Sequence, residues 1–183
     1  GENGAGKSTL MRIAFGMLRP DEGRVVVDGR EVRFANSADA IAHGVGMVHQ
    51  HFTLVPAMTV AENVSLGMHG RYDTRATAAR VQALSERTGL PLDPAARVES
   101  LPVGAQQRLE IVKALARDAR LLILDEPTAV LVPHEVDDLL RWIRRFADDG
   151  HAVVLITHKL REALAVADDV TVLRLGRTVC TGP

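Results

Sequence analysis

The chain has 183 residues, of which 46% are hydrophobic and 25% are charged, and this ordinary globular composition excludes a disordered chain. Its formal net charge of −1 argues against a general nucleic-acid-binding surface, which requires an excess of basic residues. The single cysteine, Cys180, excludes an internal disulfide, and no apolar run approaches the length of a membrane span.

The chain opens with GENGAGKST, which matches the pattern G-x-x-x-x-G-K-[ST]. Its glycines let successive backbone N–H groups point into one concavity, and the following helix directs its positive end to the same point. Lys7 supplies a cation for the β- and γ-phosphates, and the Ser8 hydroxyl suits Mg²⁺. The predicted phosphate-binding residues are Gly1, Asn3, Gly4, Ala5, Gly6, Lys7, Ser8 and Thr9.

A loop of this kind normally follows a buried strand, whereas this chain starts at the first glycine. We therefore expect a truncated N-terminus or a fragment. We also expect such a chain to bind nucleotide poorly by itself, and tight ATP binding would contradict this expectation.

Hydrophobic periodicity and turn residues predict the elements of the first part of the chain. They are a helix over residues 7–18, a hairpin over 24–34 with an Asp-Gly turn, a helix over 37–42, a buried strand over 45–48 and a helix over 59–64. Ser37 is the predicted N-cap of the second helix, and Thr59 with Glu62 forms a capping box in the third.

From about residue 71 the composition favours helix. Residues 74–88 are amphipathic, with Ala78, Val81, Ala83 and Leu84 on one side. The later elements are buried strands over 121–124 and 152–156, helices over 133–149 and 159–167, and a strand over 170–173. This order predicts an α/β fold with a mostly parallel sheet, in which 1–70 and 118–183 form the core and 71–117 an inserted helical lobe.

Two carboxylates, Asp125 and Glu126, directly follow the apolar run 121–124. Ligands of open α/β sheets bind at the carboxyl ends of the strands. Four apolar residues followed by Asp form the Walker B pattern, so we expect Asp125 to hold Mg²⁺ and Glu126 to polarise the attacking water. A solvated Asp-Glu turn is the alternative, which the glycine-rich loop upstream disfavours.

Two further polar residues follow predicted strands. His158 would reach a γ-phosphate, and Gln50 would contact both Mg²⁺ and water. Three strand ends beside one phosphate loop predict phosphoryl transfer to water. The pair His49 and His51 has a His-x-His spacing without a third ligand nearby, so a metal site there is weakly supported.

Taken in order, these motifs resemble the ATP-binding cassette of ABC transporters. The resemblance covers residues 1–182 and rests on the glycine-rich loop, Gln50, LPVGAQQR at 101–108, LLILDEPT at 121–128 and ITH at 156–158. It implies a P-loop NTPase core with an antiparallel hairpin region and a helical subdomain. The implied roles are Mg-ATP binding by Lys7, Ser8 and Thr9, metal contact by Ser8, Gln50 and Asp125, and catalysis by Glu126, His158 and Gln50.

Several segments are also similar to the first cassette of tandem ATPases that energise bacterial importers of nucleosides and simple sugars. This implies an importer ATPase at the cytoplasmic face of the membrane, with nucleosides as the expected solutes and simple sugars as the alternative. Its implied partners are a second cassette, permease subunits touched by residues 51–56 and, indirectly, a solute-binding protein, without nucleic acid. An inactive nucleotide-binding cassette and an ABC ATPase acting on ribosomes or DNA are the other classes considered.

Two departures from the family pattern fall on the surface offered to a partner cassette. The signature Leu-Ser-Gly-Gly-Gln is replaced by Leu101, Pro102, Val103, Gly104 and Ala105. Pro102 has neither a hydroxyl nor an N–H group to donate to the partner's nucleotide. Val132 replaces an aspartate. We therefore expect the site completed by Pro102 to be weakened, and Pro102→Ser to raise its turnover.

Overall fold

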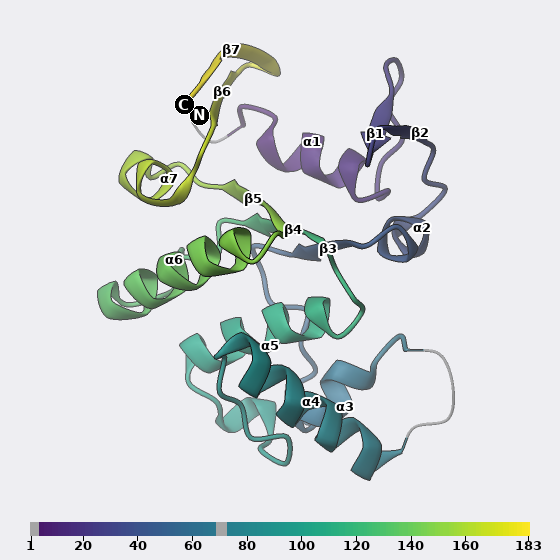
Figure 1. The fold of residues 1–183 in the computed structure, drawn as a ribbon, viewed down its shortest axis with the longest axis vertical. Coiled ribbons are helices and arrows are strands. Elements are labelled where there is room, and N and C mark those ends of the chain that lie inside the picture. The colour runs from purple at the N-terminus through teal and green to yellow at the C-terminus, as the bar shows by residue number, and fades with distance from the viewer. Residues whose placement is uncertain (1–3, 69–72) are drawn as a thin grey trace.

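The computed structural model describes residues 4–68 and 73–183. Its centre is a three-stranded parallel sheet in the order β3-β4-β5. The strands are β3 (Val45–Val48), β4 (Leu121–Asp125) and β5 (Ala152–Ile156). Val48 pairs with Leu124, and Leu124 with Leu155, so the carboxyl ends of the three strands meet at one edge. The predicted α/β fold with a parallel centre is confirmed (Figure 1).

The central strand β4 is buried, whereas β5 is largely not. Leu122, Ile123 and Leu124 are inaccessible to solvent, as their continuous apolar run predicts. In β5 only Ile156 is buried, so the expectation of a second buried strand is wrong. Within the described residues β5 pairs with β4 alone, and its position at the sheet edge leaves its other side chains partly or fully exposed.

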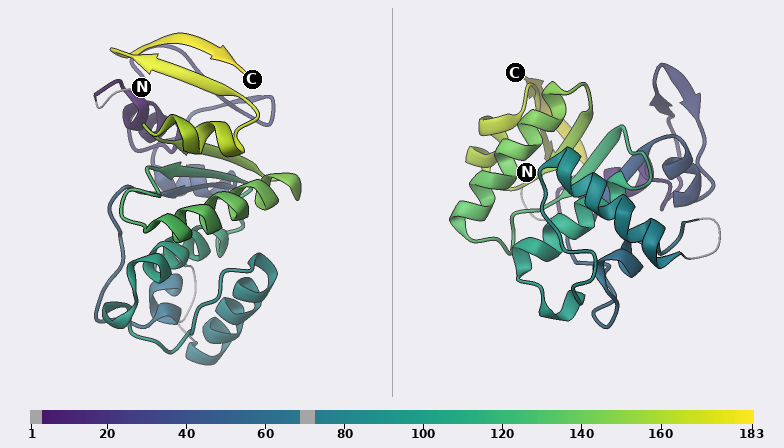
Figure 2. Two further views of the ribbon diagram at one scale, coloured as in Figure 1. Left: turned by 90° about the vertical axis from the view of Figure 1, so that its left-hand side faces the viewer. Right: turned by 60° about the horizontal axis from the view of Figure 1, so that its bottom comes forward.

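Apolar side chains pack on both faces of the sheet. On one face, α1 (Lys7–Ala14) and α2 (Ser37–Ala42) join a cluster that contains Phe15, Met47 and Ile123. On the other, α5 (Val103–Leu115) and α6 (Pro133–Asp148) join a larger cluster that contains Leu124 and Trp142. The sheet is therefore the middle layer of this part of the molecule (Figure 2).

The end of α1 and the N-cap of α2 differ from the sequence prediction. The helix α1 ends at Ala14 rather than at residue 18, because Gly16 adopts a left-handed φ of 73°. A Cβ atom at Gly16 would overlap the carbonyl of Asn36, so the chain turns closely past the next loop there. The N-cap of α2 is Asn36, whose side chain accepts hydrogen bonds from the first helical turn, and Ser37 is the first helical residue.

A helical group lies beyond α5, formed by α3 (Val60–Ser65), α4 (Thr74–Thr88) and the short 3-10 helix η1 (Val98–Ser100) (Figure 1). The capping box of α3 is present, since Thr59 and Glu62 bond each other's backbone N–H. The predicted bounds of α4 are confirmed, and Val81 and Leu84 are buried. Ala83 is exposed, contrary to the prediction, because it lies two residues from Val81 and thus on the opposite side of the helix.

Two antiparallel hairpins complete the fold, β1 (Val25–Val27) with β2 (Arg30–Val32) and β6 (Val170–Arg174) with β7 (Arg177–Gly182). The helix α7 (Leu160–Val166) precedes the second hairpin. The predicted Asp28-Gly29 turn is present, with both φ values positive. The strand β7 was not predicted, and its turn at Leu175 and Gly176 has the same pair of positive φ values.

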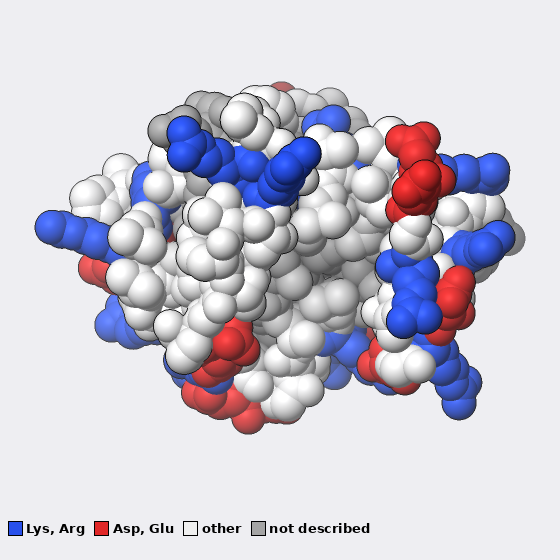
Figure 3. All heavy atoms as spheres, turned by 90° about the horizontal axis from the view of Figure 1, so that it is seen from above, with Lys and Arg blue, Asp and Glu red and all other residues white. Residues whose placement is uncertain are grey.

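No helix of the described residues is long and apolar enough to cross a membrane. On the face that carries α1 and the two hairpins, charged side chains of both signs lie around the periphery, and the hollowed middle is mostly uncharged (Figure 3).

Candidate functional site

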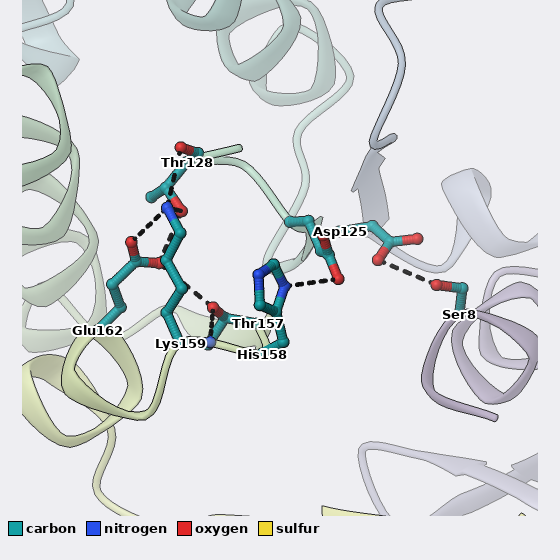
Figure 4. A network of polar contacts seen from close by, with 8 residues as sticks. Ser8, Asp125, Thr128, Thr157, His158, Lys159 and Glu162 are labelled. Carbon is teal, nitrogen blue, oxygen red and sulfur yellow. Dashed lines mark hydrogen bonds and ion pairs between the residues drawn. The ribbon is translucent and has the colours of Figure 1, made fainter. Parts of the chain in front are cut away.

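The glycine-rich loop meets the end of β4 through one hydrogen bond. The Ser8 hydroxyl donates to Oδ1 of Asp125 at 3.1 Å (Figure 4). Ser8 lies in the first turn of α1, and Asp125 ends β4 with only 4% of its surface exposed. Gly4 and Gly6 adopt φ values of 78° and 97°, which glycine reaches without strain, so the loop can curl into the helix. Two oxygens of the kind that bind Mg²⁺ thus lie side by side.

The other predicted loop residues surround this contact. Lys7, the first residue of α1, is half-buried, and Thr9 is exposed. Ala5 is buried, and its carbonyl accepts a hydrogen bond from the N–H of Gly176 in the β6–β7 turn at 3.0 Å. The second hairpin therefore braces the loop from one side. The predicted phosphate-binding residues Gly1 and Asn3 lie outside the described part of the chain.

Glu126 and His158 face each other at the ends of β4 and β5. Nδ1 of His158 lies 3.2 Å from Oε1 of Glu126 (Figure 4). The Glu126 side chain is 14% exposed and that of His158 is 47% exposed. Glu126 adopts a left-handed φ of 49°, and its N–H donates to the carbonyl of Ile156 at 2.9 Å. The structure thus brings together four of the predicted site residues in two adjacent pairs.

Gln50 is not brought into this arrangement. It is exposed, and no hydrogen bond joins it to any described residue. The chain just beyond it is held by α5, where the buried Glu110 accepts hydrogen bonds from the backbone and hydroxyl of Thr53. Lys113 donates to the Thr53 carbonyl at 3.0 Å, and burial lowers the pKa of its ammonium. These two attachments hold Thr53, three residues past Gln50, against α5.

His49 is a packing residue in this structure. Its ring lies edge-on to Phe15, with the ring centroids 6.1 Å apart. Burial lowers the pKa of the His49 imidazole, and the charges of Glu110 and Asp125 act in the opposite direction. Across residues 4–68 and 73–183, no group of three or more His, Cys, Asp or Glu side chains could hold a metal ion.

The segment in place of the family signature lies at the start of α5. Pro102 is the N-cap of this helix, and it offers no side-chain acceptor to the first turn. Gly104 packs so closely against Glu135 of α6 that a Cβ atom would overlap the carboxylate. Glu135 also accepts a hydrogen bond from the N–H of Val132, the N-cap of α6, at 3.2 Å. The Glu135 carboxylate therefore packs against Gly104 and also accepts a hydrogen bond from the turn before α6. The signature residues are Leu101, Pro102, Val103, Gly104 and Ala105.

Sequence reasoning missed a polar cluster beside the Glu126–His158 pair. Its members are Thr128, Thr157, Lys159 and Glu162 (Figure 4). The Asp-Glu-Pro-Thr and Ile-Thr-His runs contain the two threonines, but no spacing rule connects them to a glutamate on the next helix. The pairing depends on how two loops meet in the folded chain.

Three kinds of comparison relate this chain to known proteins. Residues 1–129 match the ABC transporter family. The nucleoside import ATP-binding protein NupA of Lactococcus lactis is 47% identical over 99% of this chain and 37% of its own length. The ribose import ATP-binding protein RbsA 2 of Streptomyces coelicolor is 46% identical over 98% of this chain and 35% of its own length.

The glucose import ATP-binding protein TsgD13 of Haloferax volcanii is 45% identical over 99% of this chain and 39% of its own length. The chain thus spans well under half of these relatives. Among solved structures, CbiO1 from Clostridium perfringens, part of the transporter complex CbiONQ, has a TM-score of 0.84 at 28% identity, covering 100% of this chain and 74% of that one. A dimeric cassette, MJ0796 bound to ADP and Pi, has a TM-score of 0.83 at 25% identity, covering 99% and 82%.

Proposed function

Since the chain belongs to the ABC transporter family, we propose that it is the ATP-binding and ATP-hydrolysing part of a bacterial importer. The observation that carries this proposal is the arrangement at the sheet edge. The Ser8–Asp125 contact lies at the end of β4, and the Glu126–His158 pair spans the ends of β4 and β5. Such a site positions a phosphate chain and a water molecule without needing covalent chemistry.

The chain's own residues divide the work. The loop N–H groups and Lys7 hold the phosphates. The Ser8 hydroxyl and the Asp125 carboxylate fit Mg²⁺, which favours one or two protein oxygens alongside substrate phosphates, and which neutralises phosphate charge when bound. Glu126 orients and polarises the attacking water. His158 fixes the Glu126 carboxylate and contacts the γ-phosphate.

Two further roles belong to regions outside this core. Gln50, which is exposed after β3, would contact Mg²⁺ and water when nucleotide binds. The segment at the start of α5 contacts the nucleotide of a second cassette, a pairing supported by the dimeric MJ0796 structure. Pro102 then weakens that second site, because it has no hydroxyl to offer. The contacting residues are Leu101, Pro102, Val103, Gly104 and Ala105.

We propose nucleosides as the transported solutes, supported by the similarity to NupA, and simple sugars as the second candidate, supported by the ribose and glucose import relatives. The proposed partners are permease subunits, a second cassette and, indirectly, a solute-binding protein. The protein would then lie peripherally at the cytoplasmic face of the membrane. A cassette that binds nucleotide without hydrolysing it is the contrasting proposal, favoured by Pro102 and Val132.

The test reconstitutes the natural full-length protein with its permease and binding protein in proteoliposomes. We expect Mg²⁺-dependent ATP hydrolysis that a nucleoside stimulates more than ribose or glucose does. Glu126→Gln should lower hydrolysis by about 10²-fold or more without weakening ATP binding. The exposed Glu86→Gln on α4 is the matched control, because it makes the same chemical change away from the site. Hydrolysis that survives Glu126→Gln would contradict the proposed role of this carboxylate.

A further inference from the structure

A buried carboxylate on α7 joins the two turns that carry the hydrolytic residues. Glu162 lies in the first turn of α7 with 8% of its surface exposed. Its Oε2 accepts a hydrogen bond from the Thr128 hydroxyl at 2.6 Å and a second from the Thr157 hydroxyl at 3.3 Å (Figure 4). Thr128 is itself 2% exposed. One carboxylate therefore spans the loops that follow β4 and β5.

Lys159 completes this bridge. Its ammonium lies 3.0 Å from Oε1 of Glu162, and it also donates to the Thr128 carbonyl at 3.4 Å. The backbone N–H of Lys159 donates to the Thr157 hydroxyl at 3.0 Å. Each oxygen of Glu162 thus has a partner, and its buried charge is compensated. Removing the Glu162 carboxylate would take the 2.6 Å acceptor from the buried Thr128 hydroxyl, and leaving a buried donor without its acceptor costs more than the lost bond alone.

One of the two bridged turns, the one that contains Glu126, has a strained backbone. Glu126 combines a φ of 49° with the position before Pro127, a combination that local preferences disfavour. Such a conformation persists only when its surroundings over-determine it. Two backbone hydrogen bonds contribute, from Glu126 to Ile156 at 2.9 Å and from Ala129 to Glu126 at 3.1 Å. The Glu162 bridge adds a third restraint, two residues after Glu126 and one residue before His158.

We propose that Glu162 is a positioning residue for hydrolysis. Through Thr128 and Thr157 it holds the Glu126 turn and the His158 turn in a fixed position relative to each other. The proposal rests on the proposed ATPase function and adds a role that none of the motif residues supplies. Glu162 contacts neither the phosphate loop nor the Ser8–Asp125 pair among the described contacts. Its loss should therefore affect the chemical step and leave nucleotide binding intact.

The test measures steady-state ATP hydrolysis by the natural full-length protein with its permease. Glu162→Gln should lower kcat by about 10- to 100-fold, because a small misplacement of a water-orienting carboxylate has an effect of this size. The KM for ATP should change less than about twofold, since the phosphate-binding groups are untouched. Glu86→Gln on the exposed face of α4 is the control and should match the natural protein.

A second pair of variants tests the same bridge without touching the carboxylate. Thr128→Val removes the hydroxyl but keeps the shape and should lower kcat as Glu162→Gln does, whereas Thr128→Ser keeps the hydroxyl and should restore most of the rate. The double variant Thr128→Val with Glu162→Gln should be no slower than the worse single variant, because both break one bridge. If Glu162→Gln fails to fold, the Thr128 pair alone decides.

The outcomes separate the two proposals. An unchanged kcat in Glu162→Gln or Thr128→Val, in a natural protein that hydrolyses ATP, overturns the role of Glu162 and leaves the proposed function standing. A parallel rise of KM with the fall of kcat also overturns it, because it would indicate general damage to the site. A natural protein that does not hydrolyse ATP overturns both.

Discussion

At the scale of single residues, Glu126 combines an unfavourable backbone with a functional side chain. Its left-handed φ of 49° is one that glycine adopts freely and that glutamate does not. The same backbone directs the side chain to His158 at 3.2 Å. A residue of this kind is expected where the chain gives up stability for the placement of a reactive group.

This trade-off predicts opposite effects of one substitution on stability and activity. Glu126→Gly should raise the free energy of unfolding by about 1 kcal/mol, because it removes the left-handed strain, and should abolish hydrolysis. Glu126→Gln is the matched control, since it keeps the strain while removing the charge. Denaturant unfolding followed by fluorescence measures both. Equal stability of the two variants would show that the backbone at this position carries no strain.

The site residues named from sequence share one property, which is that each lies in a motif whose spacing is local. Ser8, Asp125, Glu126 and His158 could be assigned in this way, and the structure places them in two contacting pairs. Glu162 could not be assigned from sequence, because its partner Thr128 is 34 positions away in the chain. Its recognition required the packing of α7 against the β4 loop.

At the scale of elements, α5 begins without the cap that its family pattern provides. Pro102 occupies the N-cap, and no side chain accepts from the first helical N–H groups there. Pro102 itself nevertheless has the extended backbone that an N-cap serine adopts, with φ −60° and ψ 155°. A serine could therefore be introduced without moving the chain.

We predict that the Pro102→Ser protein is more stable than the Pro102→Ala protein by about 1 kcal/mol, since both lose the proline ring and only serine can cap the helix. Thermal unfolding of the two variants checks this difference. In the natural protein only the serine variant should raise ATP turnover, because it alone supplies a hydroxyl to the opposing nucleotide. Equal turnover of the two variants would contradict the proposed contact with a partner cassette.

Elements with strong local signals were predicted well, and those that depend on neighbours were not. The helix α4 has an N-cap at Asp73 and a left-handed Gly89 at its end, and its predicted bounds are confirmed. The run expected to continue α1 to residue 18 is apolar enough for helix, but the close approach to Asn36 stops it. The strand β7 escaped prediction because its turn begins with Leu175, a residue that rarely starts a hairpin turn.

At the scale of the whole molecule, the two ends of the described chain contact each other. The turn of the second hairpin donates a hydrogen bond from Gly176 to Ala5 in the phosphate loop. A Cβ atom at Gly6 would lie 3.3 Å from the Cα of Gly176, so the two backbones are in close contact. The conformation of the β6–β7 turn therefore contributes to the shape of the phosphate loop.

We predict opposite effects for two changes in this turn. Leu175→Asn should raise the free energy of unfolding by about 0.5 kcal/mol, because asparagine tolerates a positive φ better than leucine. Gly176→Ala should lower it by about 1 kcal/mol, since alanine does not tolerate φ 73°. Gly176→Ala should also weaken ATP binding, measured by titration with a fluorescent nucleotide. Unchanged binding would show that the hairpin does not shape the loop.

The parallel sheet and its carboxyl edge followed from the alternation of apolar strands and helices. The partial exposure of β5 could not be predicted from its apolar residues, because it depends on where the strand lies in the sheet. The division into a core and a helical subdomain at 71–117 remains a prediction, and the structure adds that α3 packs with α4 and α5.

The close approach of Gly104 to Glu135 has a consequence for how sequences of this kind can diverge. Any side chain at position 104 would displace the carboxylate that caps the first turn of α6. Rotation of the flexible Glu135 side chain can make room for such a residue, but the carboxylate then gives up its hydrogen bond to the Val132 N–H. A substitution at position 104 is therefore expected to act on α6, through the loss of this cap, rather than on the backbone of α5.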